Sequence, residues 1–487
     1  MTGESRSGES RKQAARVLAA VVLAALAIAL FVGLDSGVID RISEERCVVV
    51  VRGMIASGDW LVPRLGEAVR LHKPPLFYWV GAATATLLGD TGPIAVRLPS
   101  ALAALALVAL TMRWGTTLGG LGTGARAGAV LAATVQLTIS GRRGDAEMLL
   151  ALLCAAALFT FDRIHTTRQR LLLPLFGVLA GLAFLTKATA VLLVVTLPIL
   201  VFLALERELR PLRDRAVLGS LALALAIGLS WYVAILALVP GAFENLWLDL
   251  TRPLGNAQSG AGASMHFRPV WWYLHILPSR AAPASLLLPL VAWRLVSTRL
   301  YRGEPRLRFA ALTFLVPLLA FSLLPQKQKH YTLVMLPGLA LVSAEAACAF
   351  SLRGQAWLAR SVGTPLALAG IAAVLLLTLF AAWIDASVSV TFAAGLVALG
   401  GLFTLALASA LRGEMERFAC SWLPGFLLAL ALLKGAVNVE VARLRATGPG
   451  GPSPEERRRL DQVASEHPWI VEIFRLSNPS PREAEPE

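Results

Sequence analysis

The chain has 487 residues, of which 56% are hydrophobic and only 16% are charged, with a formal net charge of +14. This balance is too apolar for an ordinary soluble protein, so we expect an integral membrane protein. The positive charge does not indicate nucleic-acid binding, because the arginines lie in short clusters at the ends of apolar runs rather than on one polar face. Composition therefore excludes a soluble domain of usual type and predicts a membrane bundle with no nucleic-acid partner.

The first apolar run, residues 17–34, follows the basic residues Arg11, Lys12 and Arg16. It is long for a signal peptide and lacks a small-residue cleavage site, so we interpret it as a retained span. A transmembrane helix needs about 20 apolar residues, and later runs reach or approach that length. They are residues 95–114, 121–140, 146–162, 171–186, 188–205, 216–239, 274–293, 309–324, 331–351, 363–384, 388–410 and 418–438. The predicted fold is an all-α polytopic bundle of about 13 transmembrane helices.

Residues 74–89 are apolar and aromatic but near the lower length limit for a span. If they do not cross, the arginine clusters all fall on the side of Arg11 and Lys12, as the positive-inside rule predicts. We therefore predict an interfacial or re-entrant helix here, and an amphipathic surface helix within residues 39–54. The prediction divides the chain into a transmembrane domain (1–439), with a first outer loop at 35–94, and a short outer tail (440–487).

Acidic residues near the membrane on the predicted outer face fall in two loops. Asp40 and Glu44 belong to the first loop, and Asp145 and Glu147 to the second. Two such acids brought together could activate an acceptor, or hold a divalent cation beside a phosphate. The alternative is that Asp145 and Glu147 only face water and cap the next helix at its positive end. The residues alone leave both interpretations open.

Basic residues on the predicted outer face go against the general charge bias. Lysine and arginine side chains suit a lipid phosphate at the membrane surface. Taken one at a time, each is equally explained by ordinary headgroup binding; as a set they favour an anionic lipid ligand. The set comprises Arg46, Arg52, Lys73, Arg142, Arg143, Lys187, Arg268, Lys327 and Lys329, with His72, His266 and His330.

Several motifs occur in a fixed order along the first two thirds of the chain. They are EER (44–46), RGMIASGDWLVP (52–63), HKPPLFYW (72–79), VRLPSA (96–101), LTK (185–187), HFRPVWWY (266–273), KQKHY (327–331) and LP (336–337). Each is weak alone, but together they resemble the ArnT-like and protein O-mannosyltransferase families. These families are membrane glycosyltransferases with the GT-C fold, and the resemblance covers about residues 30–345.

The resemblance implies transfer of a sugar from a polyprenyl-phosphate carrier to a lipid, protein or polysaccharide acceptor. The reaction would take place at the periplasmic or outer face of a bacterial inner membrane, among membrane lipids. By position, Lys73, Arg268 and Tyr331 match residues that contact the carrier phosphate, and Lys187 and Lys327 are further candidates. Arg46, His72 and His266 are other site candidates from the same motifs.

The chain departs from the family pattern in its acids. Ser43 occupies the position of the usual Asp in the first loop, so Glu44 or Asp40 would have to act in its place. His72 replaces a Glu, and the second-loop Asp aligns with Glu147, or with Asp145 after a gap of one residue.

Three explanations of these departures stay open: Glu44 or Asp40 as base with His72 as partner, a changed acceptor or metal requirement, or a homologue that binds the carrier without transferring sugar. A divalent metal would be held by Glu147 and His72. A transporter or flippase of lipid-linked sugar is less favoured, because the ionisable residues crowd into loops rather than the bilayer midplane.

Overall fold

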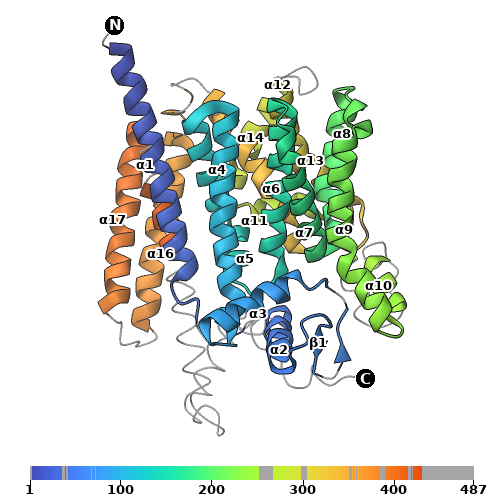
Figure 1. Cartoon of the computed structure of the whole chain (residues 1–487). Coiled ribbons are helices and arrows are strands. Elements are labelled where there is room, and N and C mark those ends of the chain that lie inside the picture. Colours follow the sequence, from blue (N-terminus) through green and yellow to red (C-terminus); the bar gives the residue numbers. More distant parts are fainter. Residues whose placement is uncertain are drawn as a thin grey trace, which may run out of the picture.

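The computed structural model describes residues 3–429 except for 36–38, 40–41, 67, 72, 252–266, 298–303, 350–353, 355, 358, 384–389, 415–417 and 419–420. Asp40, His72 and His266, and the predicted tail, therefore lie outside the described residues. Within them the regular structure is helical apart from one two-stranded hairpin, β1 (Arg64–Leu65) with β2 (Ala68–Val69), and an isolated bridge between Phe267 and Gln326. The longer helices run side by side through the molecule, as expected of apolar helices that satisfy their own backbone hydrogen bonds in a bilayer (Figure 1).

The helices fall into those that run along the bundle and those that lie between or beside them. The bundle helices are α1 (Gly3–Phe31), α4 (Pro93–Ala132), α6 (Ala146–Thr167), α7 (Leu173–Val191), α8 (Leu197–Leu205), α9 (Arg215–Leu238), α13 (Pro305–Leu323), α14 (Leu336–Ala349), α16 (Thr364–Trp383) and α17 (Val390–Arg412). The others are α2 (Ile42–Ser57), α3 (Leu76–Leu88), α5 (Val135–Gly141), α10 (Ala242–Thr251), α11 (Trp272–Arg280) and α12 (Leu288–Ser297), with a 3₁₀ helix at Lys329–Met335.

The 40-residue α4 is two antiparallel helices joined at Gly119 and Gly120. Gly120 has φ 84°, a backbone conformation that glycine adopts without strain. On either side of the break the chain packs against itself, because a Cβ placed on Gly115 would lie 3.0 Å from the Cα of Gly124. The chain therefore reverses here, between the predicted spans 95–114 and 121–140.

A second reversal occurs at Lys187, whose backbone is not helical (φ −165°, ψ 91°). Its side chain contacts Glu147 in the first turn of α6, whereas the ring of Phe202 lies 5.0 Å from that of His165 near the end of α6. The segment after Lys187 must therefore run back along the bundle. This agrees with the two spans that the sequence predicts on either side of Lys187.

Eight helices among the described residues are long and apolar enough to cross a membrane, or nine if α11 and α12, which are bent by 115°, form one span. The two reversals divide two of these helices, so the crossings outnumber them. The all-α membrane architecture is confirmed, and the total of about thirteen stays a prediction.

Charged residues gather at both ends of the bundle. We call the end where α1 begins the arginine end; it carries the pairs His165–Glu208, Arg170–Asp214, Arg294–Glu345 and Arg308–Glu206. The opposite end, where α2 and α3 lie across the bundle, is the α3 end (Figure 1). Helix α3 has 13 residues and is thus about 20 Å long, shorter than the hydrocarbon core of about 30 Å.

Candidate active site

Glu44 ties three segments together at the α3 end. It is 1% exposed, and Arg97 at the start of α4 donates to both of its carboxylate oxygens, at 2.6 and 3.1 Å. The backbone N–H of Gly144 donates to the same carboxylate at 2.9 Å. This first-loop acid is therefore fixed by a fork-to-fork ion pair that joins α2, α4 and the turn before α6.

The turn before α6 places the two second-loop acids. Arg142 donates to the carbonyls of Ala29, Leu30 and Val32 at the end of α1, where a cation satisfies free carbonyl groups. Asp145 then caps α6 by accepting from the backbone N–H of Glu147 at 3.2 Å. The capping interpretation is thus correct for Asp145, but Glu147 points elsewhere.

Glu147 is the centre of a cluster of cationic side chains that reach it from distant parts of the chain. Lys187 donates to its Oε1 at 2.9 Å, and Nε2 of His330 lies 3.3 Å from the same oxygen. Lys187 also lies over the ring of Tyr331, with its Nζ 4.7 Å from the ring centroid. The Glu147 side chain is 6% exposed, so this charge is held inside the bundle by its partners.

Lys73 joins this cluster from the loop between the β-hairpin and α3. Burial works against its charge, but the carboxylates of Glu147 and Asp145 outweigh burial and raise the pKa of Lys73 above its usual range. Lys73 is therefore a permanent cation at physiological pH. We call Lys73, Asp145, Glu147, Lys187 and Tyr331 the Glu147 cluster.

For Asp145, burial and a neighbouring charge of the same sign both work against ionisation. Burial and then the charge of Glu147 raise the pKa of Asp145 to about 6, although Lys73 acts in the other direction. A carboxylate with such a pKa is mostly ionised at pH 7 and still accepts a proton readily, as a general base must. Asp145, which caps α6, is therefore also suited to proton transfer.

Lys327 and Arg268 lie on two neighbouring segments of the chain that are hydrogen-bonded to each other. The ammonium of Lys327 donates to the carbonyls of Arg268, at 3.0 Å, and Leu324, and the Arg268 N–H donates to Pro325. Lys327 thus holds the segment that carries Arg268, whose guanidinium is exposed and donates to the carbonyl of Phe267. Arg46 is exposed on α2.

No group of three or more histidine, cysteine, aspartate or glutamate side chains among the described residues is arranged to bind a metal. Because His72 is outside that part of the chain, the predicted metal site at Glu147 and His72 stays a hypothesis.

Comparison with known proteins shows what this chain is similar to. Residues 72–233 match the family described as dolichyl-phosphate-mannose-protein mannosyltransferase. A relative from Pectobacterium carotovorum, named undecaprenyl phosphate-alpha-4-amino-4-deoxy-L-arabinose arabinosyl transferase, is 29% identical over 80% of this chain and 70% of its own length. A relative of the same name from Sodalis glossinidius, numbered 1, is 29% identical over 72% of this chain and 62% of its own length.

The fold has solved counterparts. The crystal structure of ArnT from Cupriavidus metallidurans bound to undecaprenyl phosphate superimposes with a TM-score of 0.68 at 19% identity, covering 88% of this chain and 80% of that one. The apo form gives a TM-score of 0.65, with coverage of 85% and 76%. The chain therefore has the fold of these ArnT structures.

One of the side chains that make the contacts, Arg97, was not singled out from the sequence. Arg97, the partner of Glu44, lies 53 positions away from it, and its one signal is its place in the VRLPSA motif. His330 was named among the outer-face basic residues, but not as a partner of Glu147. The structure brings together Lys73, Asp145, Glu147, Lys187 and Tyr331 among the predicted site residues, and links Glu44 to them through Gly144.

Proposed function

We propose that this chain transfers a sugar from a polyprenyl phosphate to an acceptor at the α3 end of the bundle. The observation that carries the proposal is the convergence of Lys73, Lys187 and Tyr331 around Glu147 from three separate parts of the chain. The cluster holds two ammonium groups and a phenol, and it lies at an end of the bundle near the membrane surface. Ammonium and hydroxyl groups are the hydrogen-bond donors that a lipid phosphate requires.

The reaction follows from the chemistry of these groups. An acceptor hydroxyl or amine attacks the anomeric carbon of the sugar, and the bond from that carbon to the phosphate oxygen breaks. The bonding electrons leave with the polyprenyl phosphate, whose growing negative charge Lys73 and Lys187 stabilise. Asp145 takes the proton of the acceptor, because its raised pKa suits that transfer.

Glu147 has a positioning role in this proposal. Its carboxylate holds the ammonium of Lys187 at 2.9 Å and the ring of His330 at 3.3 Å, so both keep one orientation in the absence of phosphate. Such fixed donors lower the reorganisation needed in the transition state. Glu44 has a comparable role for the turn that carries Asp145, through its contact with Gly144.

The donor to test first is undecaprenyl phosphate carrying 4-amino-4-deoxy-L-arabinose, the substrate in the names of the relatives. The acceptor classes to test are a lipid such as lipid A, a protein and a polysaccharide. The relatives fix none of these for this chain, since they are 29% identical at most. By the positive-inside rule, the α3 end faces the periplasm of a bacterial inner membrane.

The test is sugar transfer by the purified full chain in proteoliposomes with a radiolabelled donor. We expect wild type to transfer label and release polyprenyl phosphate, and Lys73→Ala to do neither at a comparable rate. Lys329→Ala, an exposed lysine of the same outer segment as Tyr331, is the matched control and should resemble wild type. Equal transfer by all three proteins would reject the site; carrier binding without transfer by wild type would favour the non-catalytic homologue.

A further inference from the structure

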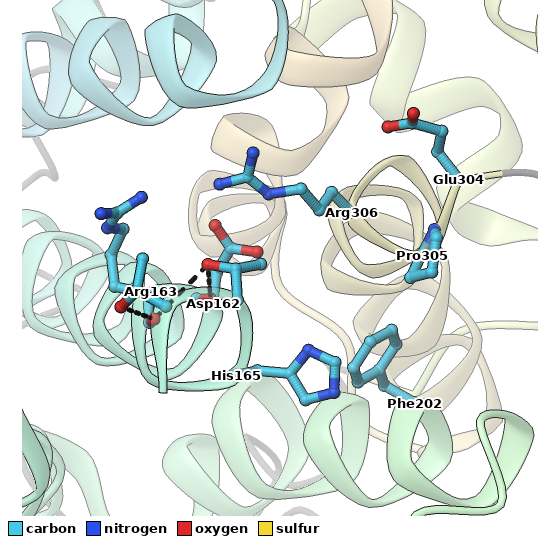
Figure 2. A pocket seen from close by; sticks show the side chains of 9 residues that line it. Asp162, Arg163, His165, Phe202, Glu304, Pro305 and Arg306 are labelled. Atoms are coloured by element: carbon cyan, nitrogen blue, oxygen red, sulfur yellow. Dashed lines mark hydrogen bonds between the residues drawn. The ribbon is translucent and has the colours of Figure 1, made fainter. Parts of the chain in front are cut away.

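A second polar site lies at the arginine end, far from the Glu147 cluster. A cavity of about 520 Å³ opens between the end of α6, the end of α8 and the start of α13, lined among others by Asp162, Arg163, His165, Phe202, Glu304 and Arg306 (Figure 2). Helix α6 has 22 residues, and the rise of 1.5 Å per residue separates Asp162 in this cavity from Glu147 by about 22 Å. The cavity is therefore no part of the proposed carrier site.

Two groups of opposite charge face each other here without pairing. Figure 2 shows the guanidinium of Arg306 extending over the carboxylate of Asp162. Within the described part of the chain, Oδ2 of Asp162 and Nε of Arg306 are enclosed without a hydrogen-bond partner, and no ion pair joins the two side chains. Asp162 is 3% exposed, and the indole nitrogen of Trp114 lies beside its carboxylate as a hydrogen-bond donor.

Asp162 and Arg306 both line the cavity, so a ligand there can contact the atoms of their charged groups that remain accessible. Arg306 is already anchored on one side, because its Nη1 donates to the carbonyl of Thr117 at 2.6 Å. Arg163 and Glu304 add one further charge of each sign to the lining. A ligand with one positive and one negative group matches this lining better than a simple anion.

The helix ends around the cavity favour the same kind of ligand. Helix α13 starts at Pro305, so its positive end faces the cavity beside Arg306. Helix α6 ends at Thr167, so its negative end lies on the side of Asp162. An anionic group is thus favoured near α13 and a cationic group near α6.

Phe202 lines the cavity and packs against further aromatic rings behind it. The ring of Phe202 lies 5.0 Å from that of Phe309, and Phe309 in turn lies 5.1 Å from Phe161 and 6.2 Å from Trp114. Polar lining beside aromatic rings, at the ends of apolar helices, is the environment at the depth of lipid headgroups.

We propose that this cavity binds a phosphoethanolamine headgroup, with the phosphate at Arg306 and the start of α13 and the ammonium at Asp162 and the end of α6. The source is phosphatidylethanolamine of the leaflet at the arginine end. Soluble phosphoethanolamine has the same chemistry, and the experiment separates the two sources.

The test is native mass spectrometry of the full chain released from detergent that contains equal amounts of phosphatidylethanolamine, phosphatidylcholine and phosphatidylglycerol. Phosphatidylcholine has no ammonium N–H to donate to Asp162, and phosphatidylglycerol has no cation. We expect wild type to retain phosphatidylethanolamine about tenfold better than either, as the loss of one charge-assisted hydrogen bond allows. Asp162→Asn and Arg306→Gln should each remove that preference.

Arg170→Gln is the matched control, because Arg170 is an exposed residue of the same end, outside the cavity lining. If Asp162→Asn fails to fold, Arg163→Gln changes a half-buried lining residue and should weaken the preference in the same direction. In a second arm, millimolar O-phosphoethanolamine that displaces the lipid would assign the site to the soluble zwitterion, and no displacement would assign it to the lipid. Equal retention of the three lipids, or a preference unchanged in all the lining variants, would overturn the proposal.

Discussion

The two ends of the bundle are both rich in charge, but they use it differently. At the arginine end the described charges form pairs such as Arg170–Asp214 and Arg294–Glu345, and the one carboxylate among them shared by two cations, Glu208, is 41% exposed. At the α3 end Lys187 and His330 share the single carboxylate of Glu147, and Lys73 is held near it. A local ion pair stabilises the connection between two helices. Several hydrogen-bond donors around one carboxylate leave some of their N–H groups available for a ligand phosphate.

The α3 end itself contains both kinds of interaction. Glu44 and Arg97 form a closed pair, because both carboxylate oxygens of Glu44 accept from Arg97. In the Glu147 cluster several donors surround one carboxylate and can also bind a ligand. We therefore expect substitutions in the closed pair to act mainly on stability and those in the cluster mainly on chemistry. The following changes test that division from the largest effect to the smallest.

Lys73→Ala should lower the transfer rate by about 10²–10³-fold, the usual cost of removing one preorganised charge from a transition state. The physical reason is that the departing phosphate loses a permanent cation. Steady-state transfer with saturating donor measures the change, and thermal unfolding of the same preparation should be close to that of wild type. A large loss of stability with normal transfer would place Lys73 among the structural residues.

Glu44→Gln should lower the free energy of unfolding by about 3–5 kcal/mol, because it leaves the 2%-exposed Arg97 as an uncompensated buried charge. The exposed neighbour change Glu45→Gln is the control, with an expected effect within about 0.5 kcal/mol. Denaturant unfolding in detergent measures both. Equal stabilities of the two variants would show that the Arg97 pair does not hold α2 in place.

The transfer rate should depend on the ionisation of Asp145. Because its pKa is raised to about 6 and the base acts when ionised, the rate should fall as pH drops through about 6, by about tenfold for each pH unit below it. Asp145→Asn should be slow at every pH and lack this limb. A wild-type profile that stays flat down to pH 5 would assign proton transfer to another group.

Arg170→Gln, at the arginine end, should have the smallest effect. Its ion pair with Asp214 has an N···O distance of 2.7 Å, but the Arg170 side chain is 73% exposed. Surface pairs contribute at most about 1 kcal/mol, so unfolding should change by less than that and transfer should not change. A clear loss of transfer would mean that the two ends are coupled.

Much of the architecture could be predicted from the sequence, because long apolar runs and the positions of arginines reflect the bilayer directly. The reversal at Lys187 followed from the lengths of the runs on either side, and Lys73, Glu147, Lys187 and Tyr331 from the family motifs. The partners could not be predicted in the same way. Arg97 pairs with Glu44 across 53 positions, and such contacts depend on which helices pack together rather than on periodicity.

The prediction of the catalytic acids was limited in the same way. Glu44 and Glu147 were predicted together as catalytic candidates, and the structure gives each a separate set of partners joined by the turn at Gly144. The raised pKa of Asp145 arises first from burial and then from Glu147; the sequence shows Glu147 two positions away but not the burial. Asp40, His72 and His266 stay predictions, since they lie outside the described residues.

The central claim is that the carrier phosphate binds at the Glu147 cluster, and an experimental structure of the full chain with undecaprenyl phosphate tests it most directly. The account predicts phosphate density within hydrogen-bond distance of the ammonium groups of Lys73 and Lys187, beside Tyr331. Phosphate density elsewhere on the α3 end, or at the arginine end, with the Glu147 cluster unchanged, would contradict it.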